Sequence, residues 1–156
     1  MSNSALIQKI LFATDFSDPS ENARKYACEL ANRTGAELHL LHVVVPLAVP
    51  AMGAPSVGYI EDTDEIAASV KQSEHNLETL LDADWRSSHR VVSGVIVGTP
   101  VFEILKYAKD HHINMIVMGT YGRTGLTHLL MGSVAENVVR KAHCPVLTVH
   151  QPKHSS

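Results

Sequence analysis

Short runs of small aliphatic residues alternate with segments of helical pattern along this chain, and this alternation restricts the possible folds more than any other feature. Each run is too apolar for a strand with one face in water, so each run predicts a strand buried on both faces. The runs are residues 9–14, 37–45, 90–97, 115–118 and 146–149. Strands separated by helices predict an α/β protein whose parallel sheet is covered by helices on both faces.

The segments between the runs carry helix signals. Asp18 is expected to cap a first helix, with Pro19 in its first turn, Glu21 completing a capping box and Gly35 ending it. Further helices are predicted over residues 61–81, from Thr99 and Pro100 onward, and over 133–142. Residues 46–58 contain three prolines, two glycines and no charged residue, so a loop is predicted there.

Length and charge limit the class of protein. The 156 residues are expected to form one domain, 1–156, ordered over about residues 5–150. A formal net charge of −3 argues against a nucleic-acid partner bound through a broad basic face.

We find no leader peptide and no apolar run of the ~18 residues that a membrane span requires, so we expect a cytoplasmic protein without membrane insertion. Cys28 and Cys144 form no disulfide framework and are expected to pack as small hydrophobes.

A glycine-containing segment follows the fourth apolar run and ends where the last helix is expected to begin. It runs from Gly119 to Ser133. Glycine lets backbone N–H groups approach an oxyanion, and a helix N-terminus after it supplies further N–H groups and a favourable dipole. Arg123 is the only Lys or Arg between Gly119 and Val139, so it is the local counter-charge. The segment therefore predicts a phosphate site.

The same residues have a second interpretation. Ser133 is expected to cap the last helix, and with Glu136 it forms a capping box, so the glycines could simply make a turn before a well-capped helix. The segment is neither a Walker loop nor a dinucleotide fingerprint.

Other candidate sites are less complete. Asp15 and Asp18 could belong to a phospho-acceptor pocket, but such a pocket also needs a lysine near the last strand. Lys141 lies in the wrong helix and does not supply it. The ten histidines show no metal-ligand spacing.

Four sequence blocks resemble the universal stress protein family over nearly the whole chain. They are residues 10–17 (ILFATDFS), 40–44 (LLHVV), 116–125 (IVMGTYGRTG) and 130–149 (LMGSVAENVVRKAHCPVLTV). The ATP-binding members of that family carry a glycine, two residues, a glycine, nine residues, a glycine and then Ser or Thr. This sequence matches that pattern at Gly119, Gly122, Gly132 and Ser133.

The resemblance implies an open five-stranded parallel sheet of order 3-2-1-4-5, a Rossmann-like fold of the adenine-nucleotide α-hydrolase type. It also implies which residues would bind the nucleotide. Asp15 would face the glycine loop and reach the ribose or a metal ion, and the backbone of Val43 would contact adenine. The remaining nucleotide-binding residues that the resemblance implies are Ala13, Thr14, Met118, Gly119, Gly122, Arg123, Gly132, Ser133 and Val134.

From these observations we expect an ATP-binding regulatory or stress-response protein that takes ATP with Mg²⁺ or Mn²⁺ and acts on a regulatory protein partner. Two alternatives remain open: a slow ATPase or phosphotransferase, for which Asp15 and His128 are the nearest candidate bases, and a dimerisation module without nucleotide. We expect at most weak ATP hydrolysis. In the implied strand order, Val146–Val149 is an uncharged edge strand, so we expect a homodimer formed through it.

Overall fold

The computed structural model describes residues 4–46, 48–50, 59–61, 63–121 and 131–151. Its strands are β1 (Lys9–Ala13), β2 (Glu37–Val44), β3 (Ala48–Pro50), β4 (Tyr59–Glu61), β5 (Val91–Val97), β6 (Met115–Gly119) and β7 (Val146–Val149). Its helices are α1 (Asp18–Thr34), α2 (Thr63–Thr79), α3 (Ala83–Ser88), α4 (Pro100–Asp110) and α5 (Ser133–Lys141).

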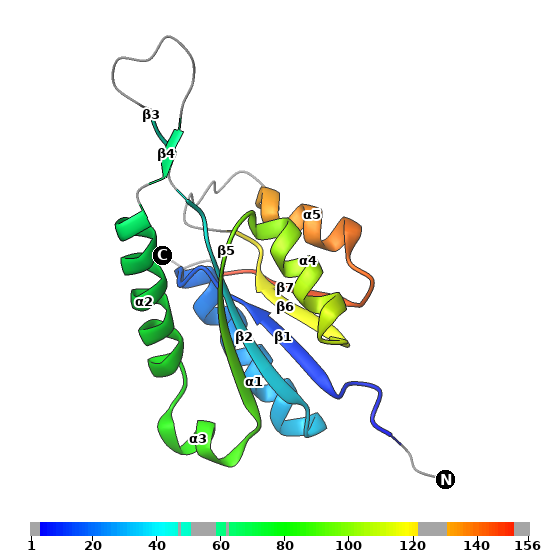
Figure 1. The fold of residues 1–156 in the computed structure, drawn as a ribbon. Coiled ribbons are helices and arrows are strands. Elements are labelled where there is room, and N and C mark those ends of the chain that lie inside the picture. The colour runs from blue at the N-terminus through cyan, green and yellow to red at the C-terminus, as the bar shows by residue number, and fades with distance from the viewer. Residues whose placement is uncertain (1–3, 47, 51–58, 62, 122–130, 152–156) are drawn as a thin grey trace, which may run out of the picture.

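Five of the strands form one parallel sheet of order β5-β2-β1-β6-β7 (Figure 1). In the register of this sheet, Ile10 lies between Leu38 of β2 and Met115 of β6. Counted over these five strands alone, the order is 3-2-1-4-5, so the expected fold class is confirmed. The chain reverses its direction across the sheet at β1, and the switch point therefore lies between β1 and β6.

Successive side chains of the central strand enter two separate cores. Ile10 and Phe12 pack with α1 and α2 on one face, and Leu11 and Ala13 pack with α4 and α5 on the other. All four are buried. This alternation explains why the run of β1 is continuously apolar, because every side chain of a strand covered on both faces is removed from water. The expectation that every run is buried on both faces is wrong for β5, which lies at the edge of the sheet and exposes several side chains, among them Val92.

Helix α1 begins one residue earlier than its expected cap. Ser17, not Asp18, is the N-cap: its backbone is extended and its hydroxyl accepts the N–H of Ser20 at 3.4 Å. Asp18 is the first helical residue, where its charge favours the helix dipole. Gly35 ends the helix as expected, with a left-handed φ of 70° and its N–H bonded to the carbonyl of Ala31.

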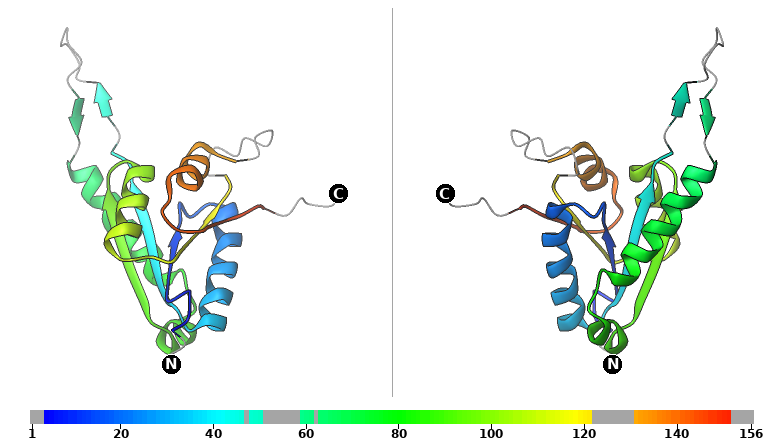
Figure 2. Two further views of the ribbon diagram at one scale, coloured as in Figure 1. Left: turned by 90° about the vertical axis from the view of Figure 1, so that its right-hand side faces the viewer. Right: turned by 90° about the vertical axis from the view of Figure 1, so that its left-hand side faces the viewer.

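The segment expected as a loop contains secondary structure. β3 and β4 pair as an antiparallel two-stranded ribbon, which projects away from the five-stranded sheet in both views of Figure 2. Because Glu61 belongs to β4, helix α2 begins at Thr63 instead of at residue 61. Proline and glycine content predicted a loop, but paired backbones on two short strands satisfy their own hydrogen bonds without an apolar pattern.

The sequence interpretation also omitted α3. Asp82 caps it by accepting the N–H groups of Asp84 and Trp85, a signal that was available in the sequence. Trp85 stacks on His89, with ring centroids 3.7 Å apart, and its indole N–H donates to Asn32 of α1. These contacts attach α3 to α1.

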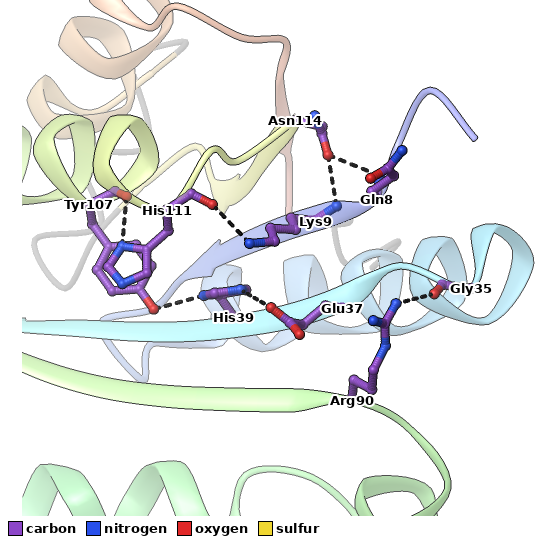
Figure 3. Close-up of polar contacts among 9 residues, drawn as sticks. All are labelled: Gln8, Lys9, Gly35, Glu37, His39, Arg90, Tyr107, His111 and Asn114. Atoms are coloured by element: carbon purple, nitrogen blue, oxygen red, sulfur yellow. Dashed lines mark hydrogen bonds and ion pairs between the residues drawn. The ribbon is translucent and has the colours of Figure 1, made fainter. Parts of the chain in front are cut away.

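Polar contacts join the elements at the amino end of the sheet (Figure 3). The side-chain oxygen of Asn114 accepts the N–H groups of Gln8 and Lys9 at 2.9 and 2.8 Å, which fixes the start of β1 beside β6. On the α4 face, the buried ring of His39 lies 2.8 Å from the hydroxyl of Tyr107 and 2.7 Å from the carboxylate of Glu37. Both ring nitrogens of His39 are therefore partnered.

Candidate functional site

A cavity of about 940 Å³ opens at the carboxyl ends of β1, β2 and β6, next to the switch point. Open α/β sheets bind their ligands at this place. Its volume lies toward the upper end of the ~300–1,000 Å³ typical of small-molecule sites. The lining comes from four regions: the turn after β1, the ends of β2 and β6 with the start of α5, one side of α2, and the first turns of α4 with Pro100 and Ile104.

Hydrogen bonds hold the turn after β1 in a defined conformation. The hydroxyl of Thr14 accepts the N–H of Phe16 at 3.0 Å and the hydroxyl of Ser20 at 2.7 Å. The carboxylate of Asp15 accepts both the N–H and the hydroxyl of Ser17. Phe16 has a φ of 63°, a left-handed conformation that costs free energy in a bulky residue and persists only where neighbouring contacts enforce it. The turn therefore fixes the position of Asp15 at the cavity.

The sequence interpretation missed His42. This buried residue of β2 lines the cavity, and its Nδ1 lies 2.8 Å from the carbonyl oxygen of Thr14. Its ring also packs on Phe16, with centroids 4.6 Å apart. His42 thus links β2 to the strained turn. The only sequence signal for it was its position directly before Val43.

Gly119 is needed for packing. A Cβ at this position would lie 2.9 Å from the carbonyl carbon of Pro19 and 3.1 Å from the N atom of Ser20. Since the first turn of α1 contacts β6 there, glycine lets the two backbones approach. The sequence argument assigned this glycine to phosphate approach alone, whereas the structure shows that it also sets the distance between α1 and β6.

Helix α5 places backbone N–H groups that have no helical partner at the cavity. Gly132 is its N-cap, so the expectation that Ser133 caps the helix is wrong. Among the residues that the structure describes, no side chain caps this end, and the carboxylate of Glu136 binds Arg140 instead of forming the expected capping box. Glu136 is the first residue whose N–H bonds back, to the carbonyl of Gly132. The N–H groups of the first three helical residues, 133–135, therefore have no helical partner, and all three residues line the cavity.

Nine of the eleven residues expected at the nucleotide line this cavity. They are Ala13, Thr14, Asp15, Val43, Met118, Gly119, Gly132, Ser133 and Val134. Gly122 and Arg123 lie outside the described residues. The lining residues that the sequence interpretation did not name include Phe16, Ser20, His42 and a row on α2. The polar pattern of α2 was visible in the sequence, but which of its sides would face a cavity was not.

The charges at the cavity favour a cation beside a bound anion. Among the described residues that line it, Asp15 and Glu65 are acidic and none is Lys or Arg. The described part of the chain also holds no cluster of three or more His, Cys, Asp or Glu that could bind a metal unaided. Mg²⁺ commonly combines one or two carboxylates with phosphate oxygens. The donor set around Asp15 therefore fits a cation that shares its ligands with a phosphate.

The fold and the position of the cavity define an open, doubly wound α/β protein of the Rossmann-like type. The sequence model of the universal stress protein family matches residues 6–150. The chain is also 36% identical over 148 residues to universal stress protein MJ0531 of Methanocaldococcus jannaschii, covering 95% of this chain and 85% of that protein. The chain belongs to the universal stress protein family.

Solved structures of this family share the fold. The structure of MJ0577 from M. jannaschii superposes with a TM-score of 0.69 at 29% identity, over 94% of this chain and 98% of that one. The universal stress protein from Archaeoglobus fulgidus in complex with dAMP gives a TM-score of 0.56 at 22% identity, over 92% and 97% of the two chains. Within the described residues of our protein, no helix is long and apolar enough to cross a membrane.

Proposed function

We propose that this protein binds ATP together with Mg²⁺ or Mn²⁺ in the cavity at the β1–β6 switch point. The observation that carries the proposal is the start of α5, where three N–H groups without helical partners line the cavity. Such donors, with the positive end of the helix dipole, stabilise a phosphate. Asp15 lies across the switch point, where its carboxylate would hold the cation.

The rest of the cavity suits the nucleoside. From the start of α5 the lining continues past Thr14 to Val43 and α2, away from the proposed phosphate position. The binding of dAMP by the A. fulgidus protein of the same fold supports an adenine nucleotide as the class of ligand. Arg123 and Gly122 are proposed to complete the phosphate site.

We propose that the bound nucleotide serves regulation, with its state read by a partner protein in the cytoplasm, and that hydrolysis is at most weak. Hydrolysis requires a group that positions or deprotonates the attacking water. In the lining that the structure describes, Asp15 already accepts two hydrogen bonds from Ser17, and His42 lies against the carbonyl of Thr14. Both side chains are thus engaged in holding the turn.

Two substitutions at one position test the phosphate site. Ser133→Ala removes only a hydroxyl, whereas Ser133→Pro also removes an N–H, at a first helical position where proline fits. By calorimetry with Mg²⁺, we expect Ser133→Pro to weaken ATP binding roughly tenfold more than Ser133→Ala, since a hydrogen bond to a charged group contributes about 1.5–3 kcal/mol. Equal affinities would contradict the site, and an absence of ATP binding by the unsubstituted protein would contradict the function.

We also propose a homodimer that pairs β7 with its own copy. β7 is an edge strand whose residues Val146, Leu147 and Thr148 are only partly buried. An uncharged edge strand is an available pairing surface, and a twofold axis would pair it with the same strand of a second chain. Light scattering at tens of micromolar is expected to give the mass of two chains, and the mass of one chain would refute the dimer.

A further inference from the structure

Helix α2 covers the cavity over much of its length instead of covering core. Only Ser73 and Leu77 of its 17 residues are buried. The side of α2 that lines the cavity is formed by Glu65, Ala68, Ser69, Gln72, Ser73 and Asn76. These positions are three and four residues apart, so they share one side of the helix. The wall of the cavity opposite the start of α5 is therefore made largely of polar side chains.

The chemistry of this wall differs from that of the proposed phosphate site. Asp64 and Glu65 lie in the first turn of α2, where their charges disfavour a phosphate. Farther along the wall, Ser69, Gln72 and Asn76 are neutral groups that can both donate and accept hydrogen bonds. A ligand with its anionic end at α5 would therefore place an uncharged polar group against α2.

Gln72 and Asn76 form a pair of carboxamides on this wall. The side-chain N–H of Gln72 donates to the side-chain oxygen of Asn76 at 3.0 Å. Within the described part of the chain, no other hydrogen bond is made by the Gln72 oxygen or by the amide nitrogen of Asn76. The pair thus offers one acceptor and one donor side by side. Adenine presents the complementary arrangement, an amino group next to a ring nitrogen, and carboxamides commonly pair with it.

We propose that Gln72 and Asn76 recognise the base of the nucleotide, with the Gln72 oxygen accepting the 6-amino group of adenine and Asn76 donating to a ring nitrogen. This inference rests on the proposed ATP binding and assigns the base specificity of the same cavity to α2. The two side chains are positioned by a helix that Leu77 anchors to the core.

A double-mutant cycle between protein and ligand tests the contact. Calorimetry would measure ATP and a purine ribonucleoside triphosphate that lacks the 6-amino group, each with Mg²⁺, on the unsubstituted protein and on Gln72→Ala. We expect Gln72→Ala to weaken ATP binding about five- to tenfold, as the loss of one hydrogen bond implies. Gln72→Ala should not weaken the binding of the analogue, because the analogue lacks the 6-amino group that Gln72 would contact. His75→Ala, at an exposed position of the same helix, serves as the control at pH 8.

The outcomes separate this inference from the proposed function. If Gln72→Ala and His75→Ala bind ATP equally, or if Gln72→Ala weakens the analogue as much as ATP, the base contact is refuted while ATP binding stands. If the unsubstituted protein binds neither triphosphate, the proposed function fails and this inference fails with it. Asn76→Ala, measured in the same way, should weaken both ligands, since both retain the ring nitrogen that Asn76 would contact. It should weaken ATP more, because Gln72 also loses the partner of its side-chain N–H.

Discussion

Helices α1 and α2 have the same length and cover the same face of the sheet, yet they pack in different ways. Each has 17 residues, and both contribute to one core. α1 buries the alanines Ala23, Ala27 and Ala31 almost completely. α2 buries only Ser73 and Leu77, and the side of this helix that includes Ser73 lines the cavity. One helix is a close-packed layer, and the other is partly the wall of a cavity.

The difference shows how side-chain size sets the place of a cavity. Alanines on α1 and the missing Cβ of Gly119 let the backbone of this helix lie close to the strands. On α2 a single large side chain, Leu77, reaches the core near the end of the helix. The earlier turns present polar groups, which stay in water because their burial would cost free energy. Two predictions test this contrast, and a third concerns a buried polar residue on the other face of the sheet.

The largest effect is expected at the anchor of α2. Leu77→Ala removes a side chain that is only 1% exposed, and should lower the free energy of unfolding by about 2–5 kcal/mol in urea denaturation. Leu77 is the only large side chain that α2 buries fully, and Leu81 continues the same core just after the helix, so Leu77 is the main apolar anchor within α2. A loss below about 1 kcal/mol would mean that other contacts attach α2, and the contrast with α1 would weaken.

The same substitution on the two helices should have opposite consequences. Ala27→Leu in α1 adds atoms to a filled core and should cost about 1–3 kcal/mol of stability without a direct effect on ligand binding. Ala68→Leu in α2 projects into the cavity, so stability should change by no more than about 0.5 kcal/mol while ATP binding weakens. Comparable losses of stability in both variants would show that α2 is packed as tightly as α1.

The third prediction concerns His39, a buried polar residue on the face of the sheet that α4 and α5 cover. Burial lowers the pKa of His39 from its ordinary value of 6.5, although the carboxylate of Glu37 raises it in part and the nearby His111 and Lys9 lower it further. Between the lowered pKa and 6.5, the unfolded chain binds more protons than the folded protein. Stability should therefore fall as the pH drops below about 6.5, until the lowered pKa is passed, by at most about 1.4 kcal/mol per pH unit.

His39→Gln tests this last, smallest effect. Because glutamine does not titrate, the stability of the variant should no longer fall in this way as the pH drops. This expectation concerns the slope with pH and holds whatever the variant's absolute stability at pH 8. Urea denaturation at pH 5 to 8 measures the two slopes. Identical slopes for the two proteins would show that the buried His39 ring takes up its proton in the folded state as readily as in the unfolded chain.

Local signals predicted most of the fold and part of the site. Gly35 ended α1 as its sequence indicated, and the run before Gly119 formed a central strand. Two of the errors occurred where two neighbouring residues could perform the same task. Ser17 caps α1 although Asp18 is an equally good capping residue, and Gly132 takes the N-cap position expected of Ser133, because the path of the incoming chain decides which residue has the extended backbone.

The sequence by itself determined the alternation of buried strands and helices, and from it the parallel sheet with a crevice at the carboxyl end. These follow from hydrophobic period and from the handedness of crossover connections, which act within about 30 residues of chain. Only the tertiary structure decided that His42 supports the turn after β1, that Gly119 is in contact with Pro19, and that Gln72 faces a cavity. Each of these depends on the distance between elements far apart in the chain, and that distance is set by how side chains fill the space between them.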